Sequence, residues 1–217
     1  MIEASEKVDL PPTEPVPEPT KEGFRWSELV QVVLLTLAIV IPVRLFLANP
    51  FKVDGASMEP NYYNKEYLVV DELTYHFQAP KRGEVVVFHP PSDPSKYFIK
   101  RVIGLPGETV EMVNGTVKIY NAEHPNGWVL DERSYLDLSD YSKEEMQSMT
   151  MRPTTIGSDE YFVLGDNRRG SYDSRYFGVV KRSALIGRAW LRGYPIQRWG
   201  VLTNLPNYPV PATTTTL

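Results

Sequence analysis

The stretch Glu108–Asn121, ETVEMVNGTVKIYN, contains the strongest fold signal in the chain. Two runs of alternating apolar and polar residues flank Asn114-Gly115, and this dipeptide favours the two-residue turn of a β-hairpin. Further short runs rich in Val, Ile, Tyr and Phe lie on both sides of it. They are EYLVVDEL (66–73), GEVVVFHP (83–90), YFIKRVIG (97–104), DEYFVLGDN (159–167) and VVKRSALIGRAWLRGYP (179–195). We therefore expect a mostly β protein built from antiparallel strands.

A polar segment over residues 121–157 interrupts these runs and shows weak periodicity. We interpret it as belonging to an insertion, in which DLSDYSKEEMQSM (137–149) is predicted to hold one short helix. The Pro- and Glu-rich start of the chain cannot bury apolar area, so a disordered tail is expected there.

One long apolar run, WSELVQVVLLTLAIVIPVRLFLANPF (26–51), is predicted to form a membrane anchor over residues 27–48. With its flanks it reaches the roughly 20 residues that cross a bilayer. A buried helix of a soluble protein is disfavoured because the run has no polar face. A cleaved signal peptide would need a small-x-small exit, but Phe46, two residues before Ala48, is large. Orientation is undecided, because basic residues precede and follow the span: Lys21, Arg25, Arg44 and Lys52.

The composition excludes several kinds of chemistry. The 217 residues include no cysteine, which rules out disulfides, thiolate metal sites and a cysteine nucleophile. A net charge of -4 offers no basic excess for nucleic acid. His76, His89 and His124 are scattered without metal-ligand spacing, so neither a metal nor a cofactor is expected.

Ser57, in DGASMEP (54–60), is the first candidate for catalysis. Gly55 and Ala56 beside it permit a tight bend and the close approach of a substrate. The motif alone is weak, since small-Ser-Met turns are common at protein surfaces.

Lys100, in KYFIKRVIGLPGE (96–108), is the second candidate. On a strand it shares one face with Phe98 and Val102, so covering that face would remove water from the amine. Desolvation lowers the pKa of lysine, and a neutral amine can accept a proton. The alternative from this segment alone is a strand lysine that extends to solvent.

GDNRRGSYDSRYFG (165–178) is the third candidate, a polar loop after an apolar strand. Asp173 and Arg175 are predicted to pair and to fix the loop. Ser171 or Ser174 would then be available to orient a neighbouring amine by hydrogen bonding. A purely structural polar turn remains the alternative.

Taken together, these segments resemble the type I signal peptidases, membrane-bound serine proteases of the Ser-Lys type. The order of motifs also matches: an anchor, the Ser-Met motif, then the strand-like segments. The resemblance covers about residues 49–120 and 158–195. The most specific matches are FIKRVIGLPGE (98–108) and GDNR…S.DSR.FG (165–178).

The resemblance assigns a role to each matching position. Ser57 matches the nucleophile and Lys100 the general base. Ser171 matches the serine that holds the lysine amine, and Asp173 with Arg175 matches the pair that stabilises the loop.

The resemblance also locates an oxyanion hole. Some members carry a serine two residues before the nucleophile, where this chain has Gly55. The hole would therefore use the backbone N–H of Ser57, together with a donor that the sequence does not identify.

The family fold is an antiparallel-sheet catalytic domain with a smaller inserted β domain. It divides this chain into a disordered tail (1–26), an anchor (27–48), a first catalytic segment (49–108), an inserted domain (109–157), a second catalytic segment (158–205) and a C-terminal tail (206–217).

The implied activity is removal of signal peptides from exported preproteins after a small-x-small motif, without cofactor or metal. The implied partners are preprotein signal peptides, the lipid bilayer and the protein-export machinery, and not nucleic acid. The implied location is the plasma (inner) membrane with one span and the catalytic domain on the outer or periplasmic side, or a thylakoid membrane if the organism has one.

Three rival interpretations compete with this function. The main one is a membrane-anchored β-rich binding or scaffold protein of the same fold without activity. A Ser-His-Asp hydrolase using His76 or His89 would be expected to show a Gly-x-Ser-x-Gly elbow, which the sequence lacks. A self-cleaving Ser-Lys regulator would carry a DNA-binding module in place of the anchor.

Overall fold

The computed structural model describes residues 26–42, 49–202, 205–206 and 208. The chain divides into two compact units, Met1–Ile39 and Val40–Leu217. The predicted disordered tail (1–26) and C-terminal tail (206–217) lie almost entirely outside the described residues.

Helix α1, Trp26–Pro42, belongs to the first unit up to Ile39. Its side chains from Trp26 to Val40 are exposed. Among the residues that the structure describes, no helix combines the length and hydrophobicity needed to span a bilayer. The anchor predicted over 27–48 includes residues 43–48, which are not described, and it stays a prediction.

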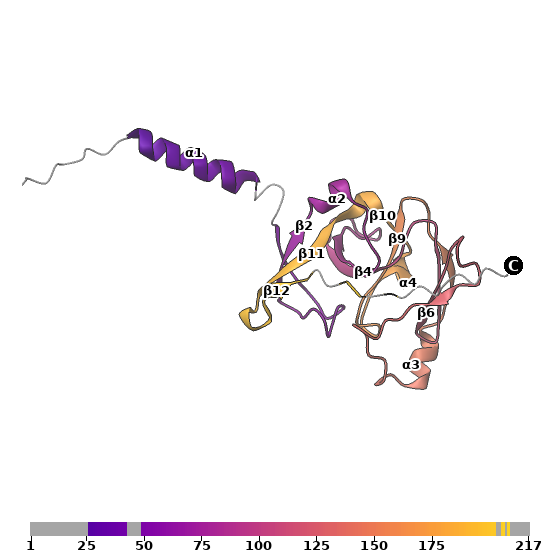
Figure 1. Cartoon of the computed structure of the whole chain (residues 1–217). Coiled ribbons are helices and arrows are strands. Elements are labelled where there is room, and N and C mark those ends of the chain that lie inside the picture. Colours follow the sequence, from indigo (N-terminus) through magenta and orange to yellow (C-terminus); the bar gives the residue numbers. More distant parts are fainter. Residues whose placement is uncertain (1–25, 43–48, 203–204, 207, 209–217) are drawn as a thin grey trace, which may run out of the picture. The chain divides into compact units, whose positions relative to one another are not determined.

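The second unit is mostly β, and its paired strands are antiparallel, as the sequence predicts (Figure 1). Its large sheet has the strand order β1-β2-β11-β3-β4-β9-β10, and β12 pairs with β11. The strands are β1 Asn49–Lys52, β2 Tyr67–Asp71, β3 Val85–Phe88, β4 Phe98–Gly104, β9 Glu160–Leu164, β10 Val180–Lys181, β11 Leu185–Tyr194 and β12 Gly200–Val201.

A second sheet of four strands has the order β7-β6-β5-β8. Its strands are β5 Thr109–Val113, β6 Thr116–Tyr120, β7 Trp128–Val129 and β8 Met151–Thr155. Asn114 and Gly115 both adopt positive φ, at 48° and 73°, so the predicted hairpin turn is confirmed. All four strands come from the segment predicted to be an insertion, although the sequence signal did not identify β7 or β8.

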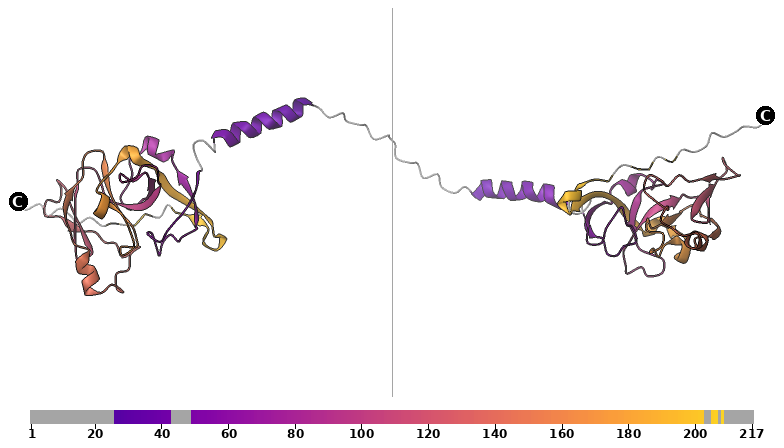
Figure 2. Two further views of the ribbon diagram at one scale, coloured as in Figure 1. Left: turned by 180° about the vertical axis from the view of Figure 1, so that it is seen from behind. Right: turned by 90° about the horizontal axis from the view of Figure 1, so that it is seen from below.

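Short helices complete the second unit. The predicted helix in 137–149 is confirmed as α3, Lys143–Ser148, and a capping box between Ser142 and Glu145 starts it. It lies with the small sheet at one end of this unit (Figure 1, and from behind in Figure 2). The others are α2 Thr74–Phe77, α4 Ser174–Phe177, and the 3₁₀ turns η2 Arg182–Ala184 and η3 Ile196–Arg198.

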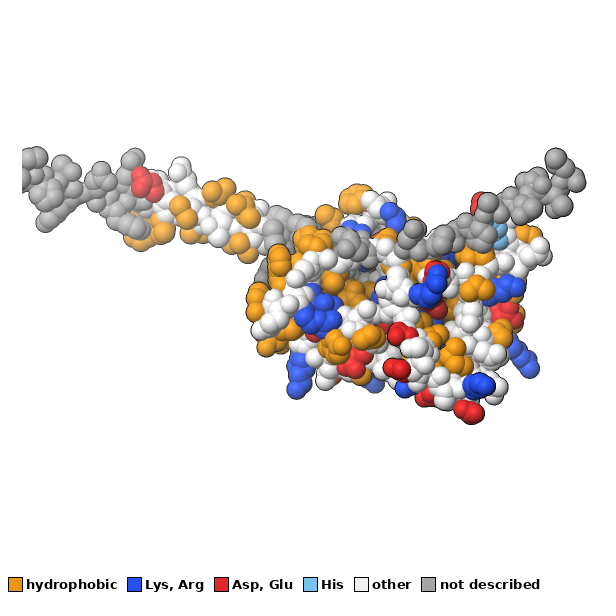
Figure 3. Space-filling view, turned by 60° about the horizontal axis from the view of Figure 1, so that its bottom comes forward, with side chains coloured by type: hydrophobic (Ala, Val, Ile, Leu, Met, Phe, Trp, Pro, Cys, Tyr) orange, Lys and Arg blue, Asp and Glu red, His pale blue; other side chains and the backbone are white. Residues whose placement is uncertain are grey.

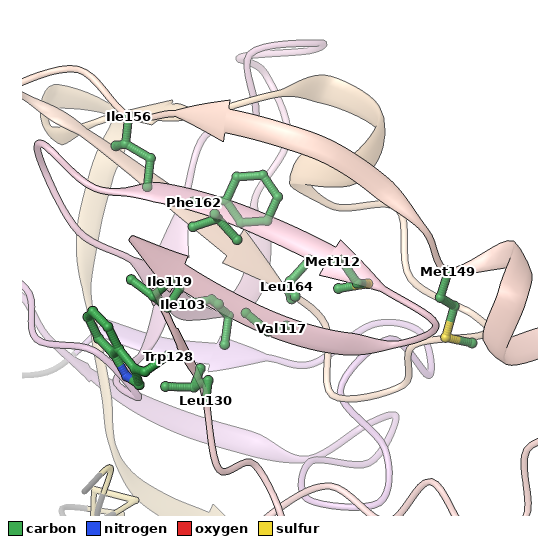
Figure 4. Close-up of a cluster of buried hydrophobic side chains, with 11 residues drawn as sticks. Ile103, Met112, Val117, Ile119, Trp128, Leu130, Met149, Ile156, Phe162 and Leu164 are labelled. Carbon is green, nitrogen blue, oxygen red and sulfur yellow. The ribbon is translucent and has the colours of Figure 1, made fainter. Parts of the chain in front are cut away.

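One apolar cluster joins the two sheets (Figure 4). Ile103 of β4 and Phe162 of β9 pack in it with Met112 of β5 and Ile119 of β6, and all four are fully buried. Gly104 permits this contact, because a Cβ there would overlap the side chain of Ile156. The small sheet therefore supports β4 and β9, the two strands that carry the lysine and lead into the Gly165 loop.

One face of the second unit mixes charges of both signs with apolar side chains (Figure 3). The face shown in Figure 3 has Lys and Arg interspersed with Asp and Glu, and hydrophobic side chains lie between them.

Candidate active site

Ser57 and Lys100 meet in the second unit. Lys100 Nζ lies 2.7 Å from Ser57 Oγ, and it also donates a hydrogen bond of 2.8 Å to the carbonyl oxygen of Ile99. Ser57 follows β1 and Lys100 is the third residue of β4, so the contact depends on the folding of the sheet. The structure brings together the two residues that the sequence singled out separately.

The backbone around Ser57 is fixed on both sides. Gly55 has φ of +95°, and its N–H donates to Asn64 Oδ1 over 3.2 Å. Met58 on the other side is fully buried. Asn167, from the Gly165 loop, donates its backbone N–H to Ser57 O over 3.0 Å. The serine is therefore tied directly to the third candidate segment.

Lys100 is almost completely buried, with 3% of its surface exposed. Burial is the largest cause of the shift that lowers its pKa from 10.5 to about 8, and the charge of Arg175 lowers it further. Asp173 and Asp166 act in the opposite direction. Phe98 covers one side, with Nζ 5.3 Å from the ring centroid. The predicted desolvation of this amine is confirmed.

The predicted pair of Asp173 and Arg175 forms. Arg175 Nε lies 2.8 Å from Asp173 Oδ1, and Arg175 Nη2 lies 2.9 Å from Oδ2. Asp173 is fully buried, accepts from the N–H of Gly165 over 2.9 Å and caps helix α4. Arg175 also donates to Arg168 O over 2.9 Å. The loop is consequently closed upon itself by charge-assisted hydrogen bonds.

The two serines of this loop differ in their contacts. Ser174 Oγ accepts from the N–H of Val163 over 3.0 Å, which connects it to β9. Ser171 is 5% exposed, and its Oγ has no partner among the described residues. A Cβ on Gly165 would overlap Ser171 Oγ. The hydroxyl predicted to hold the lysine amine is thus buried and free, while the second partner of that amine is Ile99 O; the role of Ser171 stays a prediction.

Sequence reasoning missed a buried ion pair next to the lysine. Arg101 donates to Asp166 through Nε over 2.8 Å and through Nη2 over 2.6 Å. Arg101 Nη1 donates to Gly83 O over 2.8 Å, and Asn61 donates to Asp166 Oδ2 over 2.9 Å. The pair ties β4 to the Gly165 loop. Arg101 directly follows Lys100, and Asp166 lies in the Gly-Asp-Asn motif of the third candidate segment. The presence of these two residues in the two candidate motifs was the signal that could have suggested the pair.

A second missed pair links the small-sheet segment to the same loop. Arg168, 1% exposed at its side chain, donates to Glu132 over 2.5 and 3.2 Å. Tyr135 donates its hydroxyl to Glu132 over 2.5 Å. No sequence pattern points to Glu132, because it lies in a polar segment without periodicity.

The predicted oxyanion donor is available. The backbone N–H of Ser57 donates to no group within the part of the chain that the structure describes. The second donor that the sequence left open is not identified by any contact here.

The histidines lie elsewhere. His76 Nδ1 is 3.1 Å from Glu72 O, and His89 Nδ1 is 3.0 Å from Lys96 O, both at exposed positions. The described residues contain no group of three or more carboxylate or histidine side chains suited to a metal. The contact between Lys100 Nζ and Ser57 Oγ is an arrangement in which an amine can activate a hydroxyl.

Comparisons with known proteins agree with one another. The family described as "Signal peptidase, peptidase S26" matches residues 26–194. Signal peptidase I of Leptolyngbya laminosa is 36% identical over 205 residues, covering 91% of this chain and 94% of that protein. Probable signal peptidase I-2 of Synechocystis is 37% identical over 185 residues, covering 82% and 78%.

Among solved structures, a signal peptidase I from Enterococcus faecalis is 33% identical, with a TM-score of 0.38, covering 51% of this chain and 97% of that one. The family match spans the Ser-Met motif, the lysine strand and the Gly165 loop, so the residues that meet in space all lie within the matched region. The chain belongs to the signal peptidases of peptidase family S26.

Proposed function

We propose that this protein is a membrane-anchored serine endopeptidase that removes signal peptides from exported preproteins after a small-x-small motif. The observation that carries the proposal is the 2.7 Å contact between Ser57 Oγ and the amine of Lys100, a residue that is only 3% exposed. The names of the curated relatives support the substrate class.

The reaction would begin with neutral Lys100. Its lone pair accepts the Ser57 proton as Oγ attacks the scissile carbonyl, and the new oxyanion is stabilised by the Ser57 N–H. The protonated amine then gives that proton to the leaving nitrogen, which breaks the peptide bond. Lys100, neutral again, takes a proton from a water that attacks the acyl carbonyl. It then gives this proton to Ser57 Oγ as the acyl–oxygen bond breaks and the signal peptide is released.

An extended substrate has a strand edge to pair with. β9 pairs with β4 from Arg101 onward, opposite Leu164. No described strand occupies that edge of β4 at Phe98 and Ile99. A peptide added there would hydrogen-bond to the free edge through its backbone, as in β-strand addition.

The remaining elements of the proposal come from the family. The anchor would hold the enzyme in the plasma membrane, or in a thylakoid membrane where one exists, with the catalytic domain on the outer side. Preproteins, the bilayer and the export machinery would be its partners. An inactive scaffold of the same fold would have no need for the buried amine against the serine.

The test uses full-length protein, in detergent, with a preprotein substrate and a gel readout. Ser57→Ala and Lys100→Ala should each abolish cleavage while the thermal unfolding transition is retained. Matched controls are Ser148→Ala and Lys143→Ala, exposed residues of α3, which should cleave normally. Normal turnover by either site variant, or no cleavage by the wild type, would overturn the proposal.

A further inference from the structure

A row of aromatic side chains begins beside the catalytic amine and ends at the surface. Phe98 lies against Lys100, and its ring centroid is 6.4 Å from that of Tyr172 in an edge-on arrangement. Tyr172 stacks on Tyr176, with centroids 5.5 Å apart and planes 25° apart. Phe177 supports the row from within, 6.3 Å from Phe98 and 5.5 Å from Tyr172.

The outer members of this row are unusually exposed for stacked aromatic rings. Tyr172 is 49% exposed and Tyr176 is 66% exposed. The backbone beneath them is nevertheless rigid, because Tyr172 lies between buried Ser171 and buried Asp173. A fixed aromatic surface loses little conformational entropy when it binds a chain.

The chemistry of the proposed reaction decides which portion of a substrate would meet this row. Lys100 must return a proton to the leaving nitrogen, so that nitrogen lies within hydrogen-bond reach of Nζ. Phe98 lies against the same amine, with its ring centroid 5.3 Å from Nζ, so the first mature residue, which carries this nitrogen, would lie beside Phe98. An extended chain advances about 3.3 Å per residue, so the next one or two residues reach Tyr172.

We propose that Tyr172, stacked on Tyr176, binds the first residues of the mature chain, on the carboxyl side of the scissile bond, and favours apolar or aromatic side chains there. This inference rests on the proposed function and adds a specificity determinant to it. Tyr172 is a substrate-contacting residue and takes no part in the proton transfers.

The test compares two peptides with the same signal half, ending in alanine. One continues with Phe-Phe after the scissile bond and the other with Gly-Gly. Wild type should show a kcat/KM about threefold to tenfold higher for the Phe-Phe peptide, the factor that one aromatic contact typically supplies. Tyr172→Ala should lose this preference, and Tyr172→Phe should retain it because the ring remains.

Two controls separate contact from other effects. Phe77→Ala removes an aromatic ring that is 80% exposed on α2, and it should keep the wild-type preference. A methyl ester of the same signal half lacks a mature chain, so wild type and Tyr172→Ala should cleave it at equal rates.

The outcomes are distinct. An equal loss for both peptides and the ester would show a structural role and overturn the inference. A loss that occurs only in lipid vesicles, equal for both peptides, would show a membrane contact and also overturn it. Equal rates for both peptides in wild type, with Ser57→Ala inactive, would refute the inference alone. Cleavage by Ser57→Ala would instead refute the proposed function.

Discussion

Lys100 lies within β4 of the large sheet, and Lys118 lies within β6 of the small sheet. The two sheets differ in whether they bury charged side chains. Lys100 is buried against Ser57 in the large sheet, whereas Lys118 is half-exposed and lies 4.9 Å from the ring centroid of Tyr120. Of the four described strands of the small sheet, none has a buried charged side chain.

Buried charges instead gather around β4 and the Gly165 loop, for example Arg101, Asp166 and Asp173. Burying a charge is unfavourable unless it is paired, and these charges have partners: Arg101 pairs with Asp166, and Asp173 pairs with Arg175. The small sheet supplies apolar packing that holds the cluster in place. The comparison indicates that the large sheet carries the buried charges and the candidate catalytic pair, and that the small sheet packs against it.

The largest effect is expected on enzymatic activity when Lys100 is replaced. Lys100→Arg keeps a positive charge but cannot become neutral at working pH, so kcat should fall on the order of 10⁴- to 10⁶-fold. Lys118→Arg, in the small sheet, should leave preprotein cleavage unchanged. An active Lys100→Arg enzyme would show that the amine is not the base.

The second-largest effect is expected on protein stability when the ion pair between Arg101 and Asp166 is broken. Asp166→Asn leaves Arg101 buried without a countercharge, which should lower the free energy of unfolding by about 3–5 kcal/mol in urea titrations. Glu111→Gln in the small sheet is the comparison, since Glu111 accepts from Tyr120 at a half-buried position. Its effect should stay within about 1 kcal/mol. Equal effects would remove the distinction between the two regions.

The third effect is the pH dependence of cleavage. The pKa of Lys100 is lowered to about 8, so the amine is protonated and inactive as a base below that pH. The kcat/KM should fall about tenfold per pH unit below about pH 8 and level off above it. A flat profile from about pH 5 to 9 would contradict general-base catalysis by this lysine.

The same pKa shift predicts a change in stability. The unfolded chain keeps the lysine proton up to about pH 10.5, whereas the folded protein releases it near pH 8. The free energy of unfolding should therefore rise between about pH 8 and 10.5, relative to the Lys100→Met variant. No such rise would mean that the amine is solvated in the folded state.

The smallest effect is expected from a change in the apolar packing of the small sheet. Ile119→Val removes one buried methylene from the small sheet and should lower stability by about 0.5–1.5 kcal/mol. Activity per folded molecule, measured at a temperature well below unfolding, should stay at the wild-type level. A large loss of activity would show that the small sheet contributes directly to catalysis.

Some of the site could be predicted because its signals are local. Asp173 and Arg175 are two residues apart, so their pairing needs only the loop. Glu132 and Arg168 are 36 residues apart, and no periodic pattern indicates that they meet. Ser171 was predicted to contact the lysine amine; its buried Oγ has no partner among the described residues, and its role stays a prediction.

By itself, the sequence determined the hairpin at Asn114-Gly115 and the β class, and it predicted Ser57 and Lys100 as the candidate catalytic residues. Turn propensity and side-chain alternation are properties of neighbouring residues, so they are readable without the fold. Only the tertiary structure decided that the amine is buried and lies 2.7 Å from the hydroxyl. The desolvation of the amine and its distance from the hydroxyl depend on segments that are distant in the chain, so no local sequence pattern indicates either of them.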